Sequence, residues 1–198
     1  MPKPGPYKKK QSRAPCKAFM EAGSCKNKRC PFVHDKKSGN AGSLLVAMLK
    51  LLFEKQQLNL YDADTGMLHL TKLAHCPDVE AVRSSIDFNT AAFCDALVTV
   101  IKEVVKPSPS FLVVDENGIN SPLHMLKAVV THGLHGAIRG LSFAKNNIKT
   151  LDFLPTLSQF TALQEVVFEK NPCADLDDYR SGIRKRFPDL LGLDHQGI

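Results

Sequence analysis

Apolar residues followed by an asparagine recur at one fixed spacing in the second half of the chain. The two clearest copies are Ile138, Leu141, Phe143, Asn146 and Ile148, and then Leu163, Val166, Phe168, Asn171 and Cys173. Apolar residues two positions apart predict a short strand that buries one face. The asparagine amide that follows can bond backbone groups of a neighbouring segment where the chain turns.

Two weaker copies precede them. The first consists of Leu112, Val114, Asn117 and Ile119, with Pro109 where an aliphatic residue is expected, and the other of Leu68, Leu70 and Leu73, with leucine at the asparagine position. This spacing resembles the template of leucine-rich repeats, L-x-x-L-x-L-x-x-N-x-(L/C). It predicts an α/β solenoid of about four repeats. The alternative is an ordinary α/β domain with two chance matches.

Helical patterns lie between and around these strands. Ser43 can cap an apolar helix over residues 44–54, which we interpret as the N-terminal cap of the solenoid. The alternative is an amphipathic helix that binds a partner. Apolar residues at helical spacing predict helices from Asn89 or Thr90 to Pro107 and from Ser121 to Gly133. A last helix over residues 177–187 is expected to cover the open C-terminal coil.

The positive charge is confined to the N-terminal fifth of the chain. Residues 1–37 hold 11 Lys and Arg against Glu21 and Asp35, a net charge of +9, whereas the remainder holds 15 basic and 18 acidic residues, a net charge of −3. This asymmetry indicates a polyanionic partner for the N-terminus, RNA or DNA before membrane. The longest apolar run, residues 44–53, is too short to span a bilayer, so we expect a soluble intracellular protein.

Four metal-ligating residues fall within nineteen positions near the N-terminus: Cys16, Cys25, Cys30 and His34. Three thiolates and one imidazole complete a tetrahedral shell, which predicts one structural Zn²⁺ ion. The alternative of free buried thiols fits poorly with so basic a segment. The other cysteines are scattered, as expected in a reducing compartment. We therefore divide the chain into a disordered basic arm (1–14), a zinc finger (15–37), a linker (38–42) and the repeat domain (43–198).

This segment resembles the CCCH zinc fingers, whose members mostly bind single-stranded RNA. Phe19 and Phe32 occupy aromatic positions of that family and could stack on bases, although a role in wrapping the zinc is as plausible. No aromatic residue stands between Cys25 and Cys30, so we expect phosphate contacts with weak sequence selectivity. The expected RNA-contacting residues are Lys8, Lys9, Lys10, Arg13, Lys17, Phe19, Lys26, Lys28, Arg29, Phe32, Lys36 and Lys37.

The repeat region also resembles one particular family. The segments 58–62 and 67–73, Asn171-Pro172 and the ending from Tyr179 to Asp194 are similar to the first repeat and the repeat cap of the TAP or nuclear RNA export factor family. The resemblance implies the RNA cargo-binding part of a nuclear mRNA export receptor that shuttles through the nuclear pore. Here a CCCH finger stands where the family commonly has an RNA-recognition fold.

The resemblance also implies export adaptor proteins as partners of the solenoid. The family's NTF2-like domain, with its small partner, and its nucleoporin-binding UBA-like domain are expected only in parts outside these 198 residues. The alternative function is a protein-interaction scaffold with a purely structural finger. Its concave face would present Ser142, Ala144, Glu165, Val167 and Glu169, a mixed and slightly acidic set. Isolated histidines and the lack of a catalytic motif argue against an enzyme.

Zinc removal is expected to unfold residues 15–36, because so short a module has almost no apolar core of its own. The repeat domain should keep its circular dichroism under the same treatment. Chelation followed by far-ultraviolet circular dichroism tests this. A cooperative loss of both signals would show that the finger and the repeats form one folding unit.

Overall fold

The computed structural model describes residues 40–76, 79 and 83–197. The expected arm and zinc finger lie outside these residues, as do the first two positions of the expected linker. The chain divides into two compact units, residues 1–43 and 44–198, and the second contains all of the repeats.

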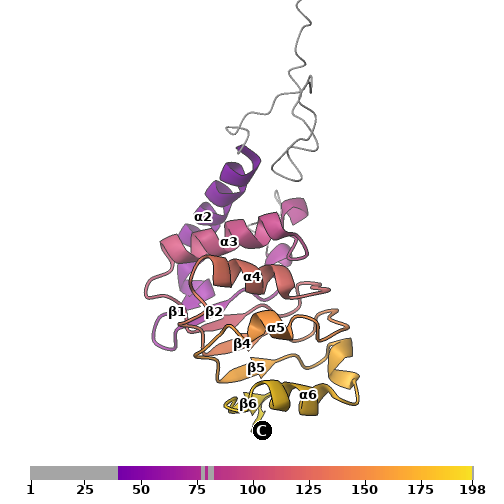
Figure 1. The fold of residues 1–198 in the computed structure, drawn as a ribbon. Helices are drawn as coiled ribbons and strands as arrows, with labels where there is room; N and C mark the ends of the chain where they lie inside the picture. The colour runs from indigo at the N-terminus through magenta and orange to yellow at the C-terminus, as the bar shows by residue number, and fades with distance from the viewer. Residues whose placement is uncertain (1–39, 77–78, 80–82, 198) are drawn as a thin grey trace, which may run out of the picture. The chain divides into compact units, whose positions relative to one another are not determined.

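A single seven-stranded sheet runs along the repeat unit (Figure 1). Strands β2 to β6 are parallel, and each pairs with the next in chain order. The outermost strands, β1 and β7, pair antiparallel to their neighbours. The strand bounds are β1 Tyr61–Asp62, β2 Met67–His69, β3 Phe111–Val113, β4 Gly140–Ser142, β5 Glu165–Val167, β6 Gly192–Leu193 and β7 Gln196–Gly197.

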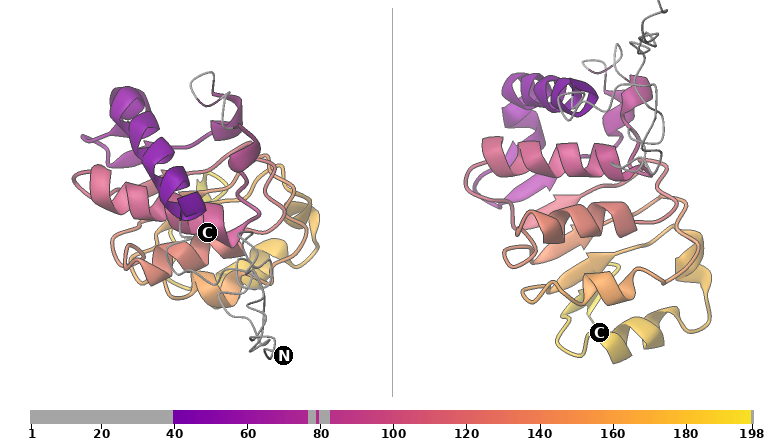
Figure 2. Two further views of the ribbon diagram at one scale, coloured as in Figure 1. Left: turned by 90° about the horizontal axis from the view of Figure 1, so that it is seen from above. Right: turned by 45° about the horizontal axis from the view of Figure 1, so that its top comes forward.

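Helices connect successive strands and stack along one face of the sheet (Figures 1 and 2). Thr90 caps α3, as expected, by accepting a hydrogen bond of 3.4 Å from the backbone N–H of Phe93. The helix that follows β2 is the longest of the four connecting helices. Their bounds are α3 Ala91–Val104, α4 Leu123–Thr131, α5 Leu154–Leu157 and α6 Tyr179–Arg186, with 3-10 turns η2 Leu73–His75 and η4 Pro172–Asp175.

The N-terminal helix α2 spans Asn40–Leu60 and is longer than its sequence pattern predicts. It begins inside the expected linker, so Ser43 lies within the helix and is not its cap. It also continues past Glu54, because Lys55 and the two glutamines after it are good helix formers and no Pro or Gly intervenes.

One face of α2 covers the first coil. Leu49, Leu52 and Phe53 are buried in the hydrophobic core, whereas Leu51 is 56% exposed. An ion pair between Lys50 and Glu103 connects α2 to α3. The helix therefore acts as the expected N-terminal cap, although only one face is covered.

The apolar positions of all four repeat copies point into one core. Leu68, Leu112, Leu141, Val166 and Leu193 occupy one row across the paired strands and are buried. Phe143 and Phe168 stack between neighbouring coils with ring centroids 5.8 Å apart and an interplanar angle of 4°. The repeat prediction is confirmed.

Each repeat asparagine bonds the backbone of the coil that precedes it. Asn146 Oδ1 accepts from the N–H groups of Asn117 and Ile119 at 2.9 and 3.1 Å, and its Nδ2 donates to Val114 O at 3.1 Å. Asn171 repeats the pattern one coil later, with Ile148 N–H as its donor at 3.0 Å. These asparagines form a ladder, here called the asparagine ladder, made of Asn117, Asn146 and Asn171.

The ladder explains why the first copy carries leucine at the asparagine position. Asn117 reaches back to that coil, where its Oδ1 accepts from Leu73 N–H at 2.9 Å and its Nδ2 donates to Leu70 O at 2.8 Å. Within the described residues no repeat precedes the first coil, so an asparagine there would have no described coil to bond, and burying an unpaired amide is costly. Leu73 is instead 2% exposed and part of the core.

Both edges of the parallel sheet are closed by hairpins, which the sequence pattern did not predict. Residues 61–66 contain strand β1 and an Asp62-centred turn in which Thr65 Oγ1 donates to Asp62 Oδ2 at 2.7 Å. Gly66 has φ +68°, and a Cβ there would lie 2.5 Å from Ser110 Oγ. At the other end, Tyr179 OH donates to Asp194 Oδ2 at 2.9 Å and holds α6 to the β6–β7 hairpin.

Asn146→Ala is expected to lower the free energy of unfolding by about 3–5 kcal/mol, because it strands several buried backbone groups. The matched control is its exposed neighbour Asn147, whose replacement by Ala should change stability by less than about 0.5 kcal/mol. Urea denaturation of both variants measures the difference. Equal losses would contradict the role of the ladder.

Candidate interaction surface on the open face of the sheet

The sheet face that carries no helices is hollowed. Alternate strand residues point away from the core on this face, and they surround a hollow of about 460 Å³. We call this surface the open sheet face. Its lining includes all five outward residues expected from the sequence: Ser142, Ala144, Glu165, Val167 and Glu169.

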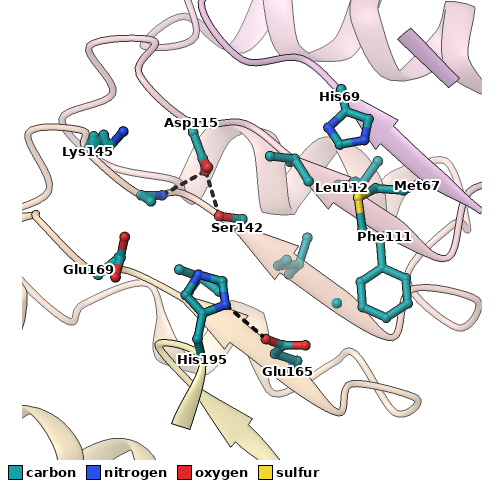
Figure 3. Close-up of a pocket in the computed structure, with 15 residues that line it drawn as sticks. Met67, His69, Phe111, Leu112, Asp115, Ser142, Lys145, Glu165, Glu169 and His195 are labelled. Carbon is teal, nitrogen blue, oxygen red and sulfur yellow. Dashed lines mark hydrogen bonds and ion pairs between the residues drawn. The ribbon is translucent and has the colours of Figure 1, made fainter. Parts of the chain in front are cut away.

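The floor of the hollow is apolar and its most prominent side chain is Phe111 (Figure 3). Phe111 pairs with Gly140 on the next strand. A Cβ at Gly140 would lie 2.0 Å from Phe111 Cδ1, so the missing side chain is what leaves room for the ring. Phe111 also lines a second hollow of about 430 Å³ that contains Leu191, which is 66% exposed.

Acidic groups outnumber basic ones around the main hollow. Asp115, Glu165 and Glu169 line it, and Lys145 is the one lysine or arginine among the lining residues that the structure describes. Lys145 Nζ is itself paired with Glu116 at 3.2 Å. The side chains of Glu165 and Glu169 remain 39% and 36% exposed. The face therefore carries negative charge that is open to a partner.

The carboxylate of Asp115 is held against the strands by hydrogen bonds. Its Oδ1 accepts from Ser142 Oγ at 2.6 Å and from Ala144 N–H at 2.9 Å (Figure 3). Removal from water raises the pKa of Asp115, and these two hydrogen bonds offset the shift only in part.

Glu116, the next residue, behaves in the opposite way. Lys72 and Lys145 from the adjoining coils donate to its carboxylate at 2.9 and 3.2 Å and lower the pKa of Glu116. Lys72, Glu116 and Lys145 have positive φ angles of 53°, 56° and 53°. Each stands directly before the ladder position of its coil. The repeated left-handed turn thus brings these side chains into one row.

Sequence reasoning missed several residues of the open sheet face. Phe111 and Asp115 could have been found, because they alternate with the buried Leu112 and Val114. His195 could not, since it lies in the unpredicted β6–β7 hairpin. Its Nδ1 is 3.6 Å from Glu165 Oε1.

The expected zinc ligands and RNA-contacting residues all lie outside the described part of the chain. Cys16, Cys25, Cys30 and His34 therefore remain predictions, as do the twelve RNA contacts. Within residues 40–76, 79 and 83–197, no cluster of three or more potential metal ligands occurs. No helix in this same part is long and apolar enough to cross a membrane. Cys94 and Cys173 are buried thiols, and burial raises their pKa values to about 12 and about 11.

Comparison with known families identifies the N-terminal segment. Residues 11–36 match the family described as "Zinc finger C-x8-C-x5-C-x3-H type (and similar)". The chain has four residues, not five, between its second and third cysteines. Zinc binding is a general property of this finger class, and the donor set of three cysteines and one histidine fits it.

Solved structures identify the class of the second unit as a leucine-rich-repeat domain of the Mex67 type. The repeat domain of Mex67 from Chaetomium thermophilum is similar over 79% of this chain and 93% of its own length, with 21% identity and a TM-score of 0.58. A chain in a structure of Chaetomium Mex67:Mtr2 subunits is similar over 79% and 91%, with 21% identity and a TM-score of 0.59. The expected leucine-rich-repeat fold is thus confirmed. A search of curated proteins finds no match.

Asp115→Asn and Glu116→Gln are expected to shift stability in opposite directions at neutral pH. The folded-state pKa of Asp115 is raised, so its ionised form opposes folding, and the Asn variant should gain stability relative to the parent as pH rises through that pKa. The pKa of Glu116 is lowered, so its contribution is present above the unfolded pKa and is lost as pH falls through the folded one.

The measurement is urea denaturation of the parent and both variants between pH 3 and pH 7, a range of about four units that brackets ordinary carboxyl pKa values. Two variants that lose stability in parallel with rising pH would contradict the assignment of the two environments.

Proposed function

We propose that this chain is the RNA cargo-binding portion of a nuclear mRNA export receptor. One observation carries the proposal: a CCCH zinc-finger match over residues 11–36 precedes a repeat domain with the fold of the Mex67 repeat domain. Such a protein acts by binding and not by catalysis, in the nucleus and during passage through the nuclear pore.

In this proposal the N-terminal segment holds the RNA backbone. Its net charge of +9 within 37 residues supports phosphate binding, which is the part of nucleic-acid affinity that depends least on sequence. One structural zinc ion, bound by Cys16, Cys25, Cys30 and His34, folds the finger. Lys26, Lys28 and Arg29 then stand between two of the ligands, where their charges are concentrated.

The repeat domain supplies a platform for RNA and export adaptor proteins. The similar Mex67 chain occurs in a structure that also names Mtr2, which supports a role within an export assembly. The charge of residues 38–198 is −3, so their part in RNA binding is secondary to that of the N-terminus.

A second candidate is a protein-interaction scaffold whose finger is purely structural. The observation in its favour is the hollowed open sheet face, which is lined by Asp115, Glu165 and Glu169 and where the side chains of Glu165 and Glu169 are partly exposed. A bare RNA strand would bring phosphates against these groups.

Replacing Lys26, Lys28 and Arg29 together by Gln is expected to weaken binding of a single-stranded oligouridylate and to flatten its salt dependence. Three lost phosphate contacts correspond to a slope smaller by about 2 in a plot of log affinity against log salt. Fluorescence anisotropy at several salt concentrations measures both quantities, with zinc content checked for each variant.

The matched control removes three charges from the repeat domain. Arg184, Lys185 and Arg186 are exposed at the end of α6, where the helix dipole already accounts for their presence. Their replacement by Gln should leave the slope nearly unchanged. If the two triple variants behave alike, or if the finger variant binds as tightly as the parent, the purely structural finger is the better description.

A further inference from the structure

The open sheet face has the chemistry of a site for a basic side chain. Around the main hollow the ionised lining groups are three carboxylates and Lys145, and the ammonium of Lys145 is taken up by Glu116. Glu165 lies beside the apolar floor. Among the ion pairs of the described residues its partner is the exposed His195, whose Nδ1 lies 3.6 Å from Glu165 Oε1. Glu169 is paired with Lys170 Nζ at 3.9 Å, so Glu165 is the lining carboxylate that a cation entering the hollow would meet without a lysine or arginine partner in the described residues.

An aromatic ring stands next to that charge. Strand pairing aligns Phe111 with Gly140 and Gly140 with Glu165, so only the glycine separates the ring from the carboxylate across the sheet. Phe111 is half-buried and lines both hollows, and Figure 3 shows its ring and the Glu165 carboxylate on the same open face. A guanidinium group can stack on an aromatic face and bond a carboxylate in its own plane.

The way a peptide could bind here is also restricted. Strands β1 and β7 close both edges of the parallel sheet, so a partner cannot extend that sheet by pairing with β2 or β6. A partner that enters the hollow therefore lies across the open sheet face and is held through its side chains. A hollow of about 460 Å³ is within the range that holds a small group of side chains.

We propose that the open sheet face binds an extended segment of a partner protein through an arginine side chain, placed between the Phe111 ring and the Glu165 carboxylate. Apolar neighbours of that arginine contact the floor formed by Met67, Val113 and Val167. Asp115 and Glu169 favour further basic residues in the same segment. This inference does not depend on RNA binding by residues 1–37.

The probe is a displayed library of peptides with random sequence, selected on the full zinc-loaded chain. Peptides retained by the parent but not by Glu165→Lys should be rich in arginine flanked by apolar residues. Glu54→Lys provides the matched control, because Glu54 is exposed on α2 and the charge change is the same. An empty difference set, or one without basic residues, overturns the proposal.

Anisotropy with one selected labelled peptide then tests the geometry. Glu165→Lys should weaken binding at least about tenfold, which corresponds to the loss of a charge-assisted hydrogen bond. Phe111→Leu keeps the apolar bulk but loses the aromatic face, and should weaken binding about threefold. Glu54→Lys should stay within about twofold of the parent, since it alters only distant surface charge. Replacing the peptide's arginine by uncharged citrulline should match the loss in Glu165→Lys.

Thermal unfolding of each variant separates lost binding from lost folding. Equal binding of the arginine and citrulline peptides by the folded parent overturns the proposal. The proposal is also overturned if oligouridylate displaces the peptide from the variant that lacks Lys26, Lys28 and Arg29, because RNA would then be the occupant of the open sheet face. RNA affinity is measured in parallel and should be unchanged in Phe111→Leu, so a failure of RNA binding and a failure of peptide binding are read separately.

Discussion

The asparagine ladder is the interaction on which the repeat unit depends. Apolar burial favours any arrangement that hides the leucines and phenylalanines, but it does not fix how far one coil is shifted against the next. The amides of Asn117, Asn146 and Asn171 do so, because each bonds both donors and acceptors of the preceding coil. The direction of these bonds also explains the leucine at position 73. A polar group is retained only where a coil exists to pair with it.

The ladder determines the two faces of the sheet as well. With the coils in register, one set of alternate strand residues enters the core and the other forms the open sheet face. The helices occupy one side, and the hairpins at β1 and β7 cover the edges that would otherwise invite pairing with another chain. On the open sheet face, recognition proceeds through side chains. At Gly140 the ring of Phe111 occupies the space that a side chain would take.

The N-terminal segment and the repeat domain carry net charges of opposite sign. The +9 of residues 1–37 suits a polyanion, whereas the carboxylates of the open sheet face suit a basic polypeptide. Under the proposed function, opposite charge keeps the RNA and the partner protein from occupying each other's site. The pKa values of the neighbouring residues Asp115 and Glu116 are shifted in opposite directions. One carboxylate is turned into the strands and loses water, and the next is held by two lysines in the exposed row.

The repeat spacing predicted the fold class and the buried rows, and helical spacing predicted α3 with its Thr90 cap, whereas α4 begins at Leu123, two residues after the expected cap Ser121. Each of these predictions follows from contacts that recur at a fixed separation along the chain. The ligand spacing likewise indicated a zinc finger, which the family match supports. Tertiary structure alone decided the features that join distant or non-repeating segments: the β6–β7 hairpin with His195, the edge strand β1, and the placement of Phe111 over Gly140. The start of α2 at Asn40 also departs from the expectation, because the sequence of its first residues does not distinguish a flexible linker from a helix. The spacing of the buried residues can be read from the sequence, whereas side chains that meet across strands are brought together only by the register of the folded sheet.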